Sequence, residues 1–333
     1  MDSPKGIVVT GGAGFVGSHL VEHLAARYPS SRITILDNLT YAGSEENIAH
    51  LLKSSRVTLF RGDITDMETC IKILSNSELV IHLAAESHVD RSFKNPAPFI
   101  LTNVLGTQCL IEAARQSGVK LFVHCSTDEV YGEVTGQPAT EQMPFKPSNP
   151  YAASKAAAEH VLYSYRVAYN VDIRVVRANN IFGIRQHSEK LIPRFTHLAI
   201  AEKDITIHGD GQQTRSFLAV QDFCEAISIV ITNGSPGHVY NIGTDDTHTI
   251  ASIADKILNI VRPTRTRIIK VQDRPYNDKA YQIDSTKLRQ IGWTPSSTLD
   301  MTLPNLIAWY ISSHARFVPA VEKCSRRQSI GNG

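Results

Sequence analysis

Short apolar runs alternate with longer segments of helical period through the first half of the chain. The runs at 7–9, 32–36, 56–60, 78–83 and 121–125 have the length and β-branched composition of buried strands. Between them, residues 15–28 and 103–116 carry apolar positions at helical spacing, and Gly118 stands where a C-cap would end the second helix. Strands that alternate with helices predict an α/β fold with a doubly wound parallel sheet.

The pattern changes after about residue 179, where prolines and glycines punctuate shorter elements. We predict a smaller mixed C-terminal domain that binds the substrate and covers the carboxyl edge of the sheet. Residues 237–242 are typical of one further strand of the main sheet. The predicted division is 1–179, with about 212–243 returning to it, for the first domain, 180–211 and 244–317 for the second, and 318–333 for a flexible polar tail.

Composition narrows the class of protein. The 34 basic and 32 acidic residues nearly cancel, so neither nucleic acid nor a membrane surface is an expected partner. The five cysteines are scattered and include no C-x-x-C pair, which argues against a disulfide framework or a metal site. With no signal-peptide pattern and no stretch long enough to span a bilayer, we predict a cytoplasmic protein.

A glycine-rich turn follows the first strand directly and opens the first helix. Gly12, Gly14 and Gly17 satisfy G-x-G-x-x-G, a spacing that lets a backbone approach a pyrophosphate at a helix N-terminus. Asp37 ends the second strand twenty residues after Gly17, where a carboxylate binds ribose hydroxyls and repels a 2′-phosphate. A plain glycine turn is the alternative, but strand, helix and acid in register indicate a Rossmann fold that binds NAD.

The predicted cofactor site extends beyond the glycine turn. Asp63 follows another strand and either meets the adenine or is a surface acid, and the alanines after residue 83 leave room for the cofactor. The residues predicted to bind NAD are Gly11, Gly14, Phe15, Val16, Gly17, Asp37, Asn38, Asp63, Ile64, Leu83, Ala84, Ala85, Tyr151 and Lys155.

Tyr151 and Lys155 lie four residues apart, on one face of a helix that begins after Asn149-Pro150. A tyrosine hydroxyl ordinarily titrates near about 10. A nearby ammonium and a positive nicotinamide ring both favour the phenolate, so we expect Lys155 to help Tyr151 accept the proton of an alcohol. A buried tyrosine beside an exposed lysine is the alternative interpretation.

Other candidate groups also follow strand ends. Thr127, Asp128 and Glu129 come after the strand at 121–125, where ligands of parallel sheets bind, and two neighbouring carboxyls can hold different protonation states. A solvated loop with a helix-capping acid is the alternative. His88 either touches substrate or is a loop histidine. Arg215 and Arg274 are candidate phosphate clamps, or isolated surface arginines.

Taken together, these segments resemble the nucleotide-sugar 4,6-dehydratases of the extended short-chain dehydrogenase/reductase family over about residues 7–310. The matching segments are H-L-A-A-E-S-H-V-D-R-S (82–92), S-T-D-E-V-Y-G-E (126–133), N-P-Y-A-A-S-K (149–155), E-K-L-I-P (189–193) and D-R-P-Y-N-D (273–278). The last segment and I-H-G-D-G (207–211) look closer to UDP-glucose dehydratases of UDP-rhamnose synthases than to dTDP-glucose dehydratases. The resemblance therefore favours UDP-glucose as substrate, with dTDP-glucose next.

The resemblance implies a role for each candidate. Tyr151 and Lys155 would oxidise the C4 hydroxyl with NAD while Thr127 binds its oxygen. Glu129 would remove the C5 proton, and Asp128 would protonate the leaving C6 hydroxyl. The substrate-binding residues it implies are Ser87, His88, Asn180, Glu189, Lys190, Leu191, Arg215, Asn241, Arg274 and Asn277. It also implies a homodimer built through the helices that contain Asn103 and Tyr151.

Two other activities of the same family share the oxidation at C4. A nucleotide-sugar 4-epimerase usually lacks the Asp-Glu pair, and a UDP-glucuronate decarboxylase typically has Ser where Asp128 stands. Elimination needs a proton donor for the leaving hydroxyl, and Asp128 supplies it. The chain departs from the family at Phe182, usually Tyr, and at Ile184, usually Pro. These changes alter the lining of the substrate pocket and leave the acid–base residues intact.

Overall fold

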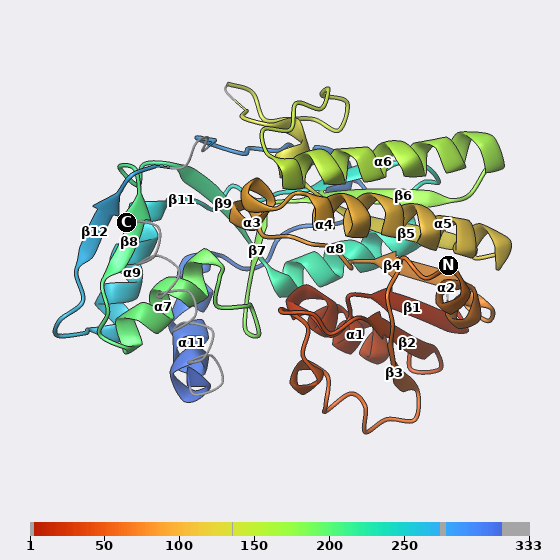
Figure 1. The fold of residues 1–333 in the computed structure, drawn as a ribbon, viewed down its shortest axis with the longest axis horizontal. Helices are drawn as coiled ribbons and strands as arrows, with labels where there is room; N and C mark the ends of the chain where they lie inside the picture. Colours follow the sequence, from red (N-terminus) through yellow and green to blue (C-terminus); the bar gives the residue numbers. More distant parts are fainter. Residues whose placement is uncertain (1–2, 135, 274–277, 315–333) are drawn as a thin grey trace.

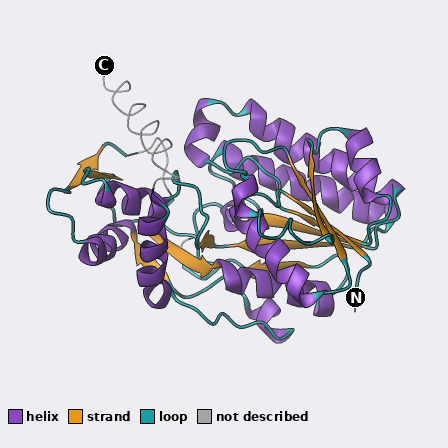
Figure 2. Cartoon of the chain, turned by 90° about the horizontal axis from the view of Figure 1, so that it is seen from below, coloured by secondary structure: helices purple, strands orange, loops and turns teal. Residues whose placement is uncertain are grey.

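The computed structural model describes residues 3–134, 136–273 and 278–314. Arg274, Asn277 and the predicted tail at 318–333 lie outside the described residues. The chain forms a large layered part built on a parallel sheet and a smaller part beyond the carboxyl end of that sheet (Figures 1 and 2). No helix within the described ranges is both long and apolar enough to cross a membrane.

Seven parallel strands form the main sheet in the order β10-β6-β5-β4-β1-β2-β3. Their bounds are β1 (Gly6–Thr10), β2 (Arg32–Asp37), β3 (Val57–Arg61), β4 (Leu79–His82), β5 (Leu121–Thr127), β6 (Ile173–Ala178) and β10 (Val239–Ile242). The strand order reverses between β1 and β4, and a crevice opens at such a point beyond the strand ends. The prediction of a Rossmann-type doubly wound sheet is confirmed.

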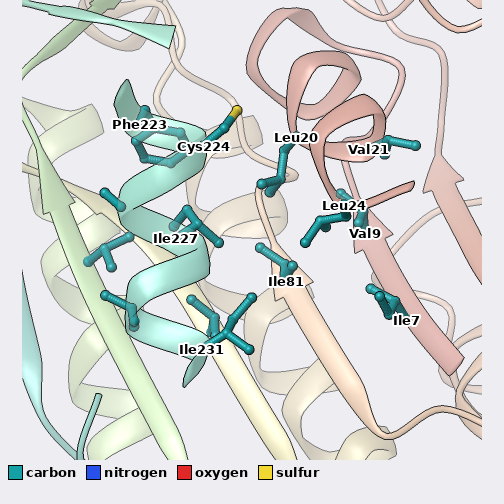
Figure 3. Packing of buried hydrophobic residues seen from close by; sticks show 14 of the residues in the cluster. Ile7, Val9, Leu20, Val21, Leu24, Ile81, Phe223, Cys224, Ile227 and Ile231 are labelled. Carbon is teal, nitrogen blue, oxygen red and sulfur yellow. The ribbon is translucent and has the colours of Figure 1, made fainter. Parts of the chain in front are cut away.

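Helices cover both faces of this sheet. They are α1 (Phe15–Arg27), α2 (Met67–Leu74), α3 (Val89–Lys94), α4 (Ala97–Phe99), α5 (Thr107–Gln116), α6 (Pro150–Tyr169) and α8 (Val220–Asn233). A π-helical segment, η2 (Ile100–Gly106), joins α4 to α5, and η1 (Glu45–Asn47) and η3 (Asp128–Tyr131) are short 3₁₀ turns. Leu20 and Leu24 of α1 and Ile227 and Ile231 of α8 are fully buried against one face (Figure 3). Residues of α2, α5 and α6 pack on the other face.

The smaller part has its own core between two short sheets and three helices. Its strands are β7 (Asn180–Phe182), β8 (Ile205–His208), β9 (Thr214–Ala219), β11 (Thr247–Thr249) and β12 (Ile268–Val271), in the orders β11-β9-β7 and β12-β8. Its helices are α7 (Leu191–Ile200), α9 (Ile250–Val261) and α11 (Leu299–Ser312), and α10 (Thr286–Gln290) precedes α11. The prediction of a smaller mixed sheet region beside the Rossmann sheet is confirmed.

Two segments lie across the boundary that the sequence predicts. Within the segment predicted to return to the first domain (about 212–243), strand β10 pairs in the main sheet and helix α8 packs against it. Strand β9, which begins this segment, instead pairs with β7 and β11 of the smaller part. Conversely, Leu288 and Trp293 are buried in the core of the Rossmann part, although we assigned them to the second domain. The division into two domains stays a prediction, because sequence period alone does not show which core an apolar residue joins.

Candidate active site

One pocket of about 560 Å³ lies where the strand order reverses and extends toward the smaller part. All but one of the described residues predicted to bind cofactor or substrate, or to act in catalysis, contribute to its lining. They are Gly11, Gly14, Phe15, Val16, Gly17, Asp37, Asn38, Asp63, Ile64, Leu83, Ala84, Ala85, Ser87, His88, Thr127, Asp128, Glu129, Tyr151, Lys155, Asn180, Glu189, Lys190, Leu191 and Arg215. The fold therefore brings these distant segments to a single cavity.

The glycine turn fits a dinucleotide. Gly11 has a φ of +69°, and a Cβ on Gly17 would lie 2.1 Å from the Gly11 carbonyl oxygen, so neither position accepts a side chain without a shift of backbone. At Gly14, the N-cap of α1, the only atom near an added Cβ is that same oxygen, at 3.3 Å. The helix has no side-chain cap and no acidic residue in its first turn. Its N–H groups are therefore available to a phosphate anion.

Asp37 is held at the end of β2 by backbone N–H groups. Its two carboxylate oxygens accept hydrogen bonds from Ala13 N (2.9 Å) and Leu39 N (2.8 Å). Each oxygen keeps a lone pair for a ribose hydroxyl. Burial raises the pKa of Asp37, and the two N–H groups oppose that rise. Nearby, the Asn38 amide donates to Asp63 at 2.7 Å, which ties the loops after β2 and β3.

The two candidate acids occupy the first turn after β5. Thr127 caps η3 by accepting from Glu129 N (3.3 Å), and its hydroxyl donates to Asp128 Oδ1 at 3.2 Å. Asn179 donates to Asp128 Oδ2 at 2.8 Å, and Asn149 donates to Glu129 Oε2 at 2.9 Å. Each carboxyl group is therefore oriented by its own amide.

The surroundings of these acids favour proton retention. Burial raises the pKa of Asp128 to about 7, and the charge of Glu129 adds to that effect, whereas Asn179, Thr127 and Arg215 oppose it. Burial also raises the pKa of Glu129. A carboxyl group with a pKa near neutrality can donate a proton at physiological pH.

Helix α6 carries the phenol and the amine. Asn149 caps this helix by accepting from Ala152 N (2.8 Å), and Pro150 occupies the first helical position. The cap fixes Tyr151 in the first turn, with Lys155 one turn later. Lys155 is 4% exposed, and its Nζ donates to the carbonyl oxygen of Cys125 at 2.7 Å.

Within the chain alone, the pKa of Tyr151 is raised rather than lowered. Burial is the main cause, and the negative charges of Glu129 and Asp128 add to it. Burial lowers the pKa of Lys155 to about 8. The expectation that Lys155 and a positive nicotinamide ring together favour the phenolate stays a prediction, because in the chain alone burial and the two acids dominate the pKa of Tyr151.

Side-chain contacts join the loops on the side of the pocket that is predicted to bind the substrate. Lys190 Nζ donates to the Ser87 carbonyl oxygen at 2.8 Å. The Glu189 carboxylate lies 3.5 Å from His88 Nε2 and accepts from the Tyr41 hydroxyl at 3.2 Å. These contacts leave cationic and polar groups around the space where a sugar diphosphate would lie.

Two residues at the far end of the pocket lie near the acid pair. Arg215 donates to the backbone oxygen of Asp278 at 3.0 Å, and its guanidinium lies 4.8 Å from the centre of the Tyr281 ring. The charge of Arg215 also acts on Asp128 and Glu129. The prediction that Arg215 serves the site therefore has a geometric basis, although sequence position alone left it open.

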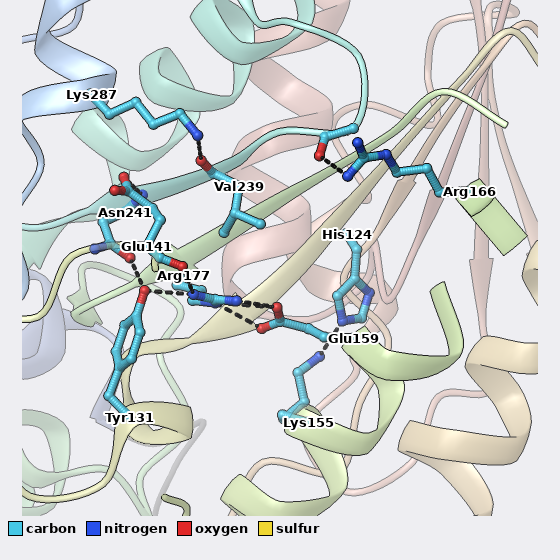
Figure 4. Close-up of polar contacts among 11 residues, drawn as sticks. His124, Tyr131, Glu141, Lys155, Glu159, Arg166, Arg177, Val239, Asn241 and Lys287 are labelled. Atoms are coloured by element: carbon cyan, nitrogen blue, oxygen red, sulfur yellow. Dashed lines mark hydrogen bonds and ion pairs between the residues drawn. The ribbon is translucent and has the colours of Figure 1, made fainter. Parts of the chain in front are cut away.

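Asn241 is the exception, and its predicted contact with the substrate stays a prediction. It is fully buried in β10, outside the pocket lining. Its amide accepts from the Tyr131 hydroxyl at 2.8 Å (Figure 4). It also donates to the backbone oxygens of Ala139 (2.8 Å) and Asp284 (3.1 Å). The side chain is thus used to join β10 to neighbouring loops.

Three contributors were missed by sequence reasoning. Asn149 was quoted only as part of a motif, although its place before Pro150 is that of an N-cap and was a readable signal. Asn179 gave no local signal, because its contact with Asp128 depends on sheet order. Tyr41 likewise gave no local signal, because its contacts depend on tertiary packing. Its ring centre lies 4.2 Å from the Arg91 guanidinium, and its hydroxyl donates to Glu189.

Comparisons with known proteins agree with this geometry. Residues 8–306 match the model of the family described as GDP-mannose 4,6 dehydratase. The low-salt glycan biosynthesis protein Agl12 of Haloferax volcanii is 40% identical over 92% of this chain and 98% of its own length. The structure of DesIV from Streptomyces venezuelae, a dTDP-glucose 4,6-dehydratase with NAD and TYD bound, is 37% identical and has a TM-score of 0.91, covering 94% of this chain and 99% of that one.

One plant relative is longer. A trifunctional UDP-glucose 4,6-dehydratase/UDP-4-keto-6-deoxy-D-glucose 3,5-epimerase/UDP-4-keto-L-rhamnose-reductase of Arabidopsis thaliana is 37% identical over 92% of this chain. The chain spans 47% of that protein, about half of its length.

The fold and the pocket define an extended short-chain dehydrogenase/reductase with a nicotinamide dinucleotide site. The chain belongs to the GDP-mannose 4,6-dehydratase family of such proteins, the nucleotide-sugar 4,6-dehydratases. It is an NAD-dependent 4,6-dehydratase. The predicted family, enzyme class and cofactor are therefore confirmed.

Proposed function

We propose that this chain converts a nucleoside diphosphate glucose, UDP-glucose before dTDP-glucose, to the 4-keto-6-deoxy derivative. The observation that carries the proposal is the pairing of two acids, the buried Asp128 and the half-buried Glu129, with Tyr151 and Lys155 around one pocket. Oxidation alone would need only the phenol and the amine. Elimination of water also needs a base at C5 and an acid at C6, and the pair supplies both.

In the first step, Tyr151 accepts the proton of the C4 hydroxyl. Bound NAD would take the C4 hydrogen as hydride and later return it to C6. A proton from Glu129, exchangeable with water, would then be added at C5 to complete the 4-keto-6-deoxy sugar. Lys155 contributes positive charge beside the phenol, and Thr127 provides a hydroxyl at the start of the same turn as the acids. Because Thr127 and Lys155 are buried and Tyr151 is half-buried in the same pocket, water competes little for these hydrogen bonds.

In the second step, the C4 ketone acidifies the neighbouring C5–H, and Glu129 removes that proton. The C5–C6 double bond forms as the C6–O bond breaks, and Asp128 donates its proton to the departing oxygen, which leaves as water. The pKa of Asp128, raised to about 7, keeps this proton available near neutrality. Asn149 and Asn179 hold the two carboxyl groups in their different orientations.

Residues of the loops that face the two acids bind the sugar diphosphate. Lys190 and Arg215 provide positive charge for phosphate oxygens. Ser87, His88, Asn180, Glu189 and Leu191 are proposed to contact the hexose or the nucleoside, as the family resemblance implies. The same resemblance assigns Arg274 and Asn277 to this set.

The preference for uridine rests on a sequence likeness. Ile207 and His208 of the I-H-G-D-G segment line the pocket, together with Thr206. That segment and D-R-P-Y-N-D resemble UDP-glucose dehydratases more than dTDP-glucose dehydratases. Phe182 packs edge-on against Phe217, with ring centres 6.3 Å apart, so the phenyl ring that replaces the usual Tyr is part of the pocket's apolar wall.

A nucleotide-sugar 4-epimerase or a UDP-glucuronate decarboxylase is the alternative within the family. Both would use the phenol and the amine, but neither reaction protonates a leaving hydroxyl at C6. Asp128 is buried and oriented by Asn179, an arrangement that an epimerase does not require.

We also propose that the enzyme acts as a homodimer in the cytoplasm. Large apolar side chains are exposed on two adjoining segments, at Ile100, Leu101 and Leu105 of η2 and at Tyr163, Val167 and Tyr169 of α6. A second copy would cover this face, because an apolar patch of this kind is costly in water. The described cysteines are free thiols, which suits a reducing compartment.

Purified protein incubated separately with UDP-, dTDP- and CDP-glucose tests the proposal. Mass spectrometry of the product should show the loss of one water from UDP-glucose at the highest kcat/KM. Turnover of dTDP-glucose with a higher kcat/KM would overturn the base preference. An isomer of unchanged mass would overturn dehydration in favour of epimerisation.

A further inference from the structure

Two buried histidines lie side by side behind the pocket. His82 of β4 and His124 of β5 are register partners, and their ring centres are 5.1 Å apart. His82 has both nitrogens satisfied, by the Thr10 hydroxyl at 2.8 Å and the Thr107 hydroxyl at 2.9 Å. This histidine has the contacts of a structural residue that links β1, β4 and α5.

His124 is bonded differently. Its Nε2 lies 3.3 Å from Lys155 Nζ (Figure 4), and its Nδ1 is buried with no hydrogen-bond partner among the described residues. An ammonium group can only donate, so Nε2 is the acceptor and Nδ1 carries the proton. The ring is thus in one tautomer, with an unpaired buried N–H.

An unpaired buried N–H is unfavourable and calls for a compensating contact. Packing alone does not explain it, because Phe122, two residues earlier on the same face of β5, is an apolar ring that is fully buried. The compensating contact of His124 is the one with Lys155. Together with the Cys125 carbonyl oxygen, it fixes two of the three N–H bonds of Lys155 to β5 and leaves one for the pocket.

We propose that His124 is a positioning residue that holds the Lys155 ammonium against β5, so that its remaining N–H serves the reacting alcohol or the cofactor. The inference rests on the proposed function in so far as Lys155 acts in oxidation at C4. It adds a residue from a buried strand to a machinery otherwise built from helix α6 and the turn after β5.

The groups that face Lys155 come from three elements. From β5 these are His124 and Cys125, and from β4 it is His82. Helix α6 itself contributes Glu159, and Tyr151 lies one helical turn before Lys155. Burial lowers the pKa of His82 to about 3 and that of His124 well below its usual value, and it raises the pKa of the Cys125 thiol to about 12.

The two α6 groups are also accounted for. Burial raises the pKa of Tyr151, and Glu159 is paired with Arg177 at 2.7 Å. Lys155 is therefore the member of this set that titrates just above neutral pH, at about 8. Removing its acceptor disfavours the ammonium, so the pKa of Lys155 must fall when His124 is replaced by an apolar residue.

The test compares His124→Leu, His124→Gln and the matched control Phe122→Leu. The Lys155 pKa is read from the carbon-13 resonance of its Cε, assigned by its absence in Lys155→Arg, so the readout does not depend on activity. Because His124→Leu removes a hydrogen bond to a charged group, we expect the titration midpoint of Lys155 to fall by about one pH unit. The Gln amide oxygen should restore most of the shift, and Phe122→Leu should leave it unchanged.

Kinetics give a second readout. The rate of C4 oxidation in the first turnover should fall about tenfold in His124→Leu above neutral pH, with KM unchanged, and recover in His124→Gln. A folded His124→Leu that keeps the wild-type midpoint would overturn the proposal. Failure of the wild type to convert any nucleotide-hexose would instead overturn the proposed function, and the resonance of Lys155 would still decide the role of His124.

The wild-type protein provides a measurement that requires no substitution. The nitrogen-15 shifts of the His124 ring must show the proton on Nδ1 and no protonation across neutral pH. A ring with its proton on Nε2 cannot accept from Lys155 and would overturn the inference, even if His124→Leu does not fold.

Discussion

Replacing Asp128 with Asn removes one proton from the site and little else. The substitution keeps the size and planarity of the side chain that lies between Thr127 and Asn179. In the native chain, burial raises the pKa of Asp128 from 3.8 to about 7. That difference corresponds to roughly 4 kcal/mol in favour of the protonated carboxyl group. Below pH 7, therefore, most molecules hold a proton ready for the C6 hydroxyl.

The amide of Asp128→Asn cannot donate an acidic proton, so elimination should slow by about 10²–10⁴-fold, the usual contribution of a general acid. Oxidation at C4 should survive, because Tyr151 and Lys155 are untouched. Rapid mixing with UDP-glucose, followed by the near-ultraviolet absorbance of the reduced nicotinamide, should then show an oxidised sugar that accumulates before water is lost.

The pH dependence supplies the sharper criterion. In the native enzyme, the rate of elimination should fall as pH rises through about 7, because Asp128 then loses its proton. The variant should lack this decline. Unchanged dehydration in Asp128→Asn, or a decline of the same midpoint in the variant, would refute the assignment of Asp128 as the acid.

The raised pKa of Asp128 also makes the stability of the folded protein depend on pH. Because the pKa of Asp128 is higher in the folded than in the unfolded chain, its contribution is fully present below about pH 4 and is lost as pH rises through about 7. The free energy of unfolding of the native protein, measured in urea, should fall relative to that of Asp128→Asn over this interval by up to roughly 4 kcal/mol. A difference independent of pH would contradict the burial argument.

Four other substitutions test separate parts of the account. Tyr151→Phe should abolish the transient reduced nicotinamide, and its appearance at the native rate would exclude the phenol as base. Asn149→Ala should lower the free energy of unfolding in urea by about 1 kcal/mol, because α6 loses its N-cap. It also removes a hydrogen-bond donor to Glu129, so the acidic side of the pH profile for the elimination rate should move to higher pH. An unchanged profile would show that Asn149 does not tune Glu129. Gly17→Ala should weaken NAD binding measured by calorimetry, because its Cβ would meet the Gly11 carbonyl; native affinity would count against the proposed phosphate site. Leu101→Glu should give a monomer in sedimentation, and an unchanged dimer would place the interface elsewhere.

Local spacing accounts for the parts of the site that could be predicted. The glycine turn, Asp37 and the Tyr151–Lys155 pair each depend on neighbours within one strand–turn–helix segment or one helix face. Their proximity within each segment therefore follows from spacing alone, and the structure brings them to the predicted edge of the sheet. The Asp128–Glu129 pair also follows directly from the end of a strand.

The remainder depends on which strands become neighbours. β5 pairs with β6 so that Thr127 lies opposite Ala178, and this register brings Asn179 to Asp128. Nothing within either segment encodes that contact. Asn241 shows the same dependence on tertiary structure, because its place on β10 brings its amide to the Tyr131 hydroxyl.

Dehydration carried out in heavy water tests the central claim most directly. If Glu129 removes the C5 proton and Asp128 releases the C6 hydroxyl, proton magnetic resonance should show a 4-keto-6-deoxy product with one deuterium at C5. A product that has lost water but keeps its original hydrogen at C5, or a sugar that is oxidised and reduced at C4 without losing water, would contradict the account.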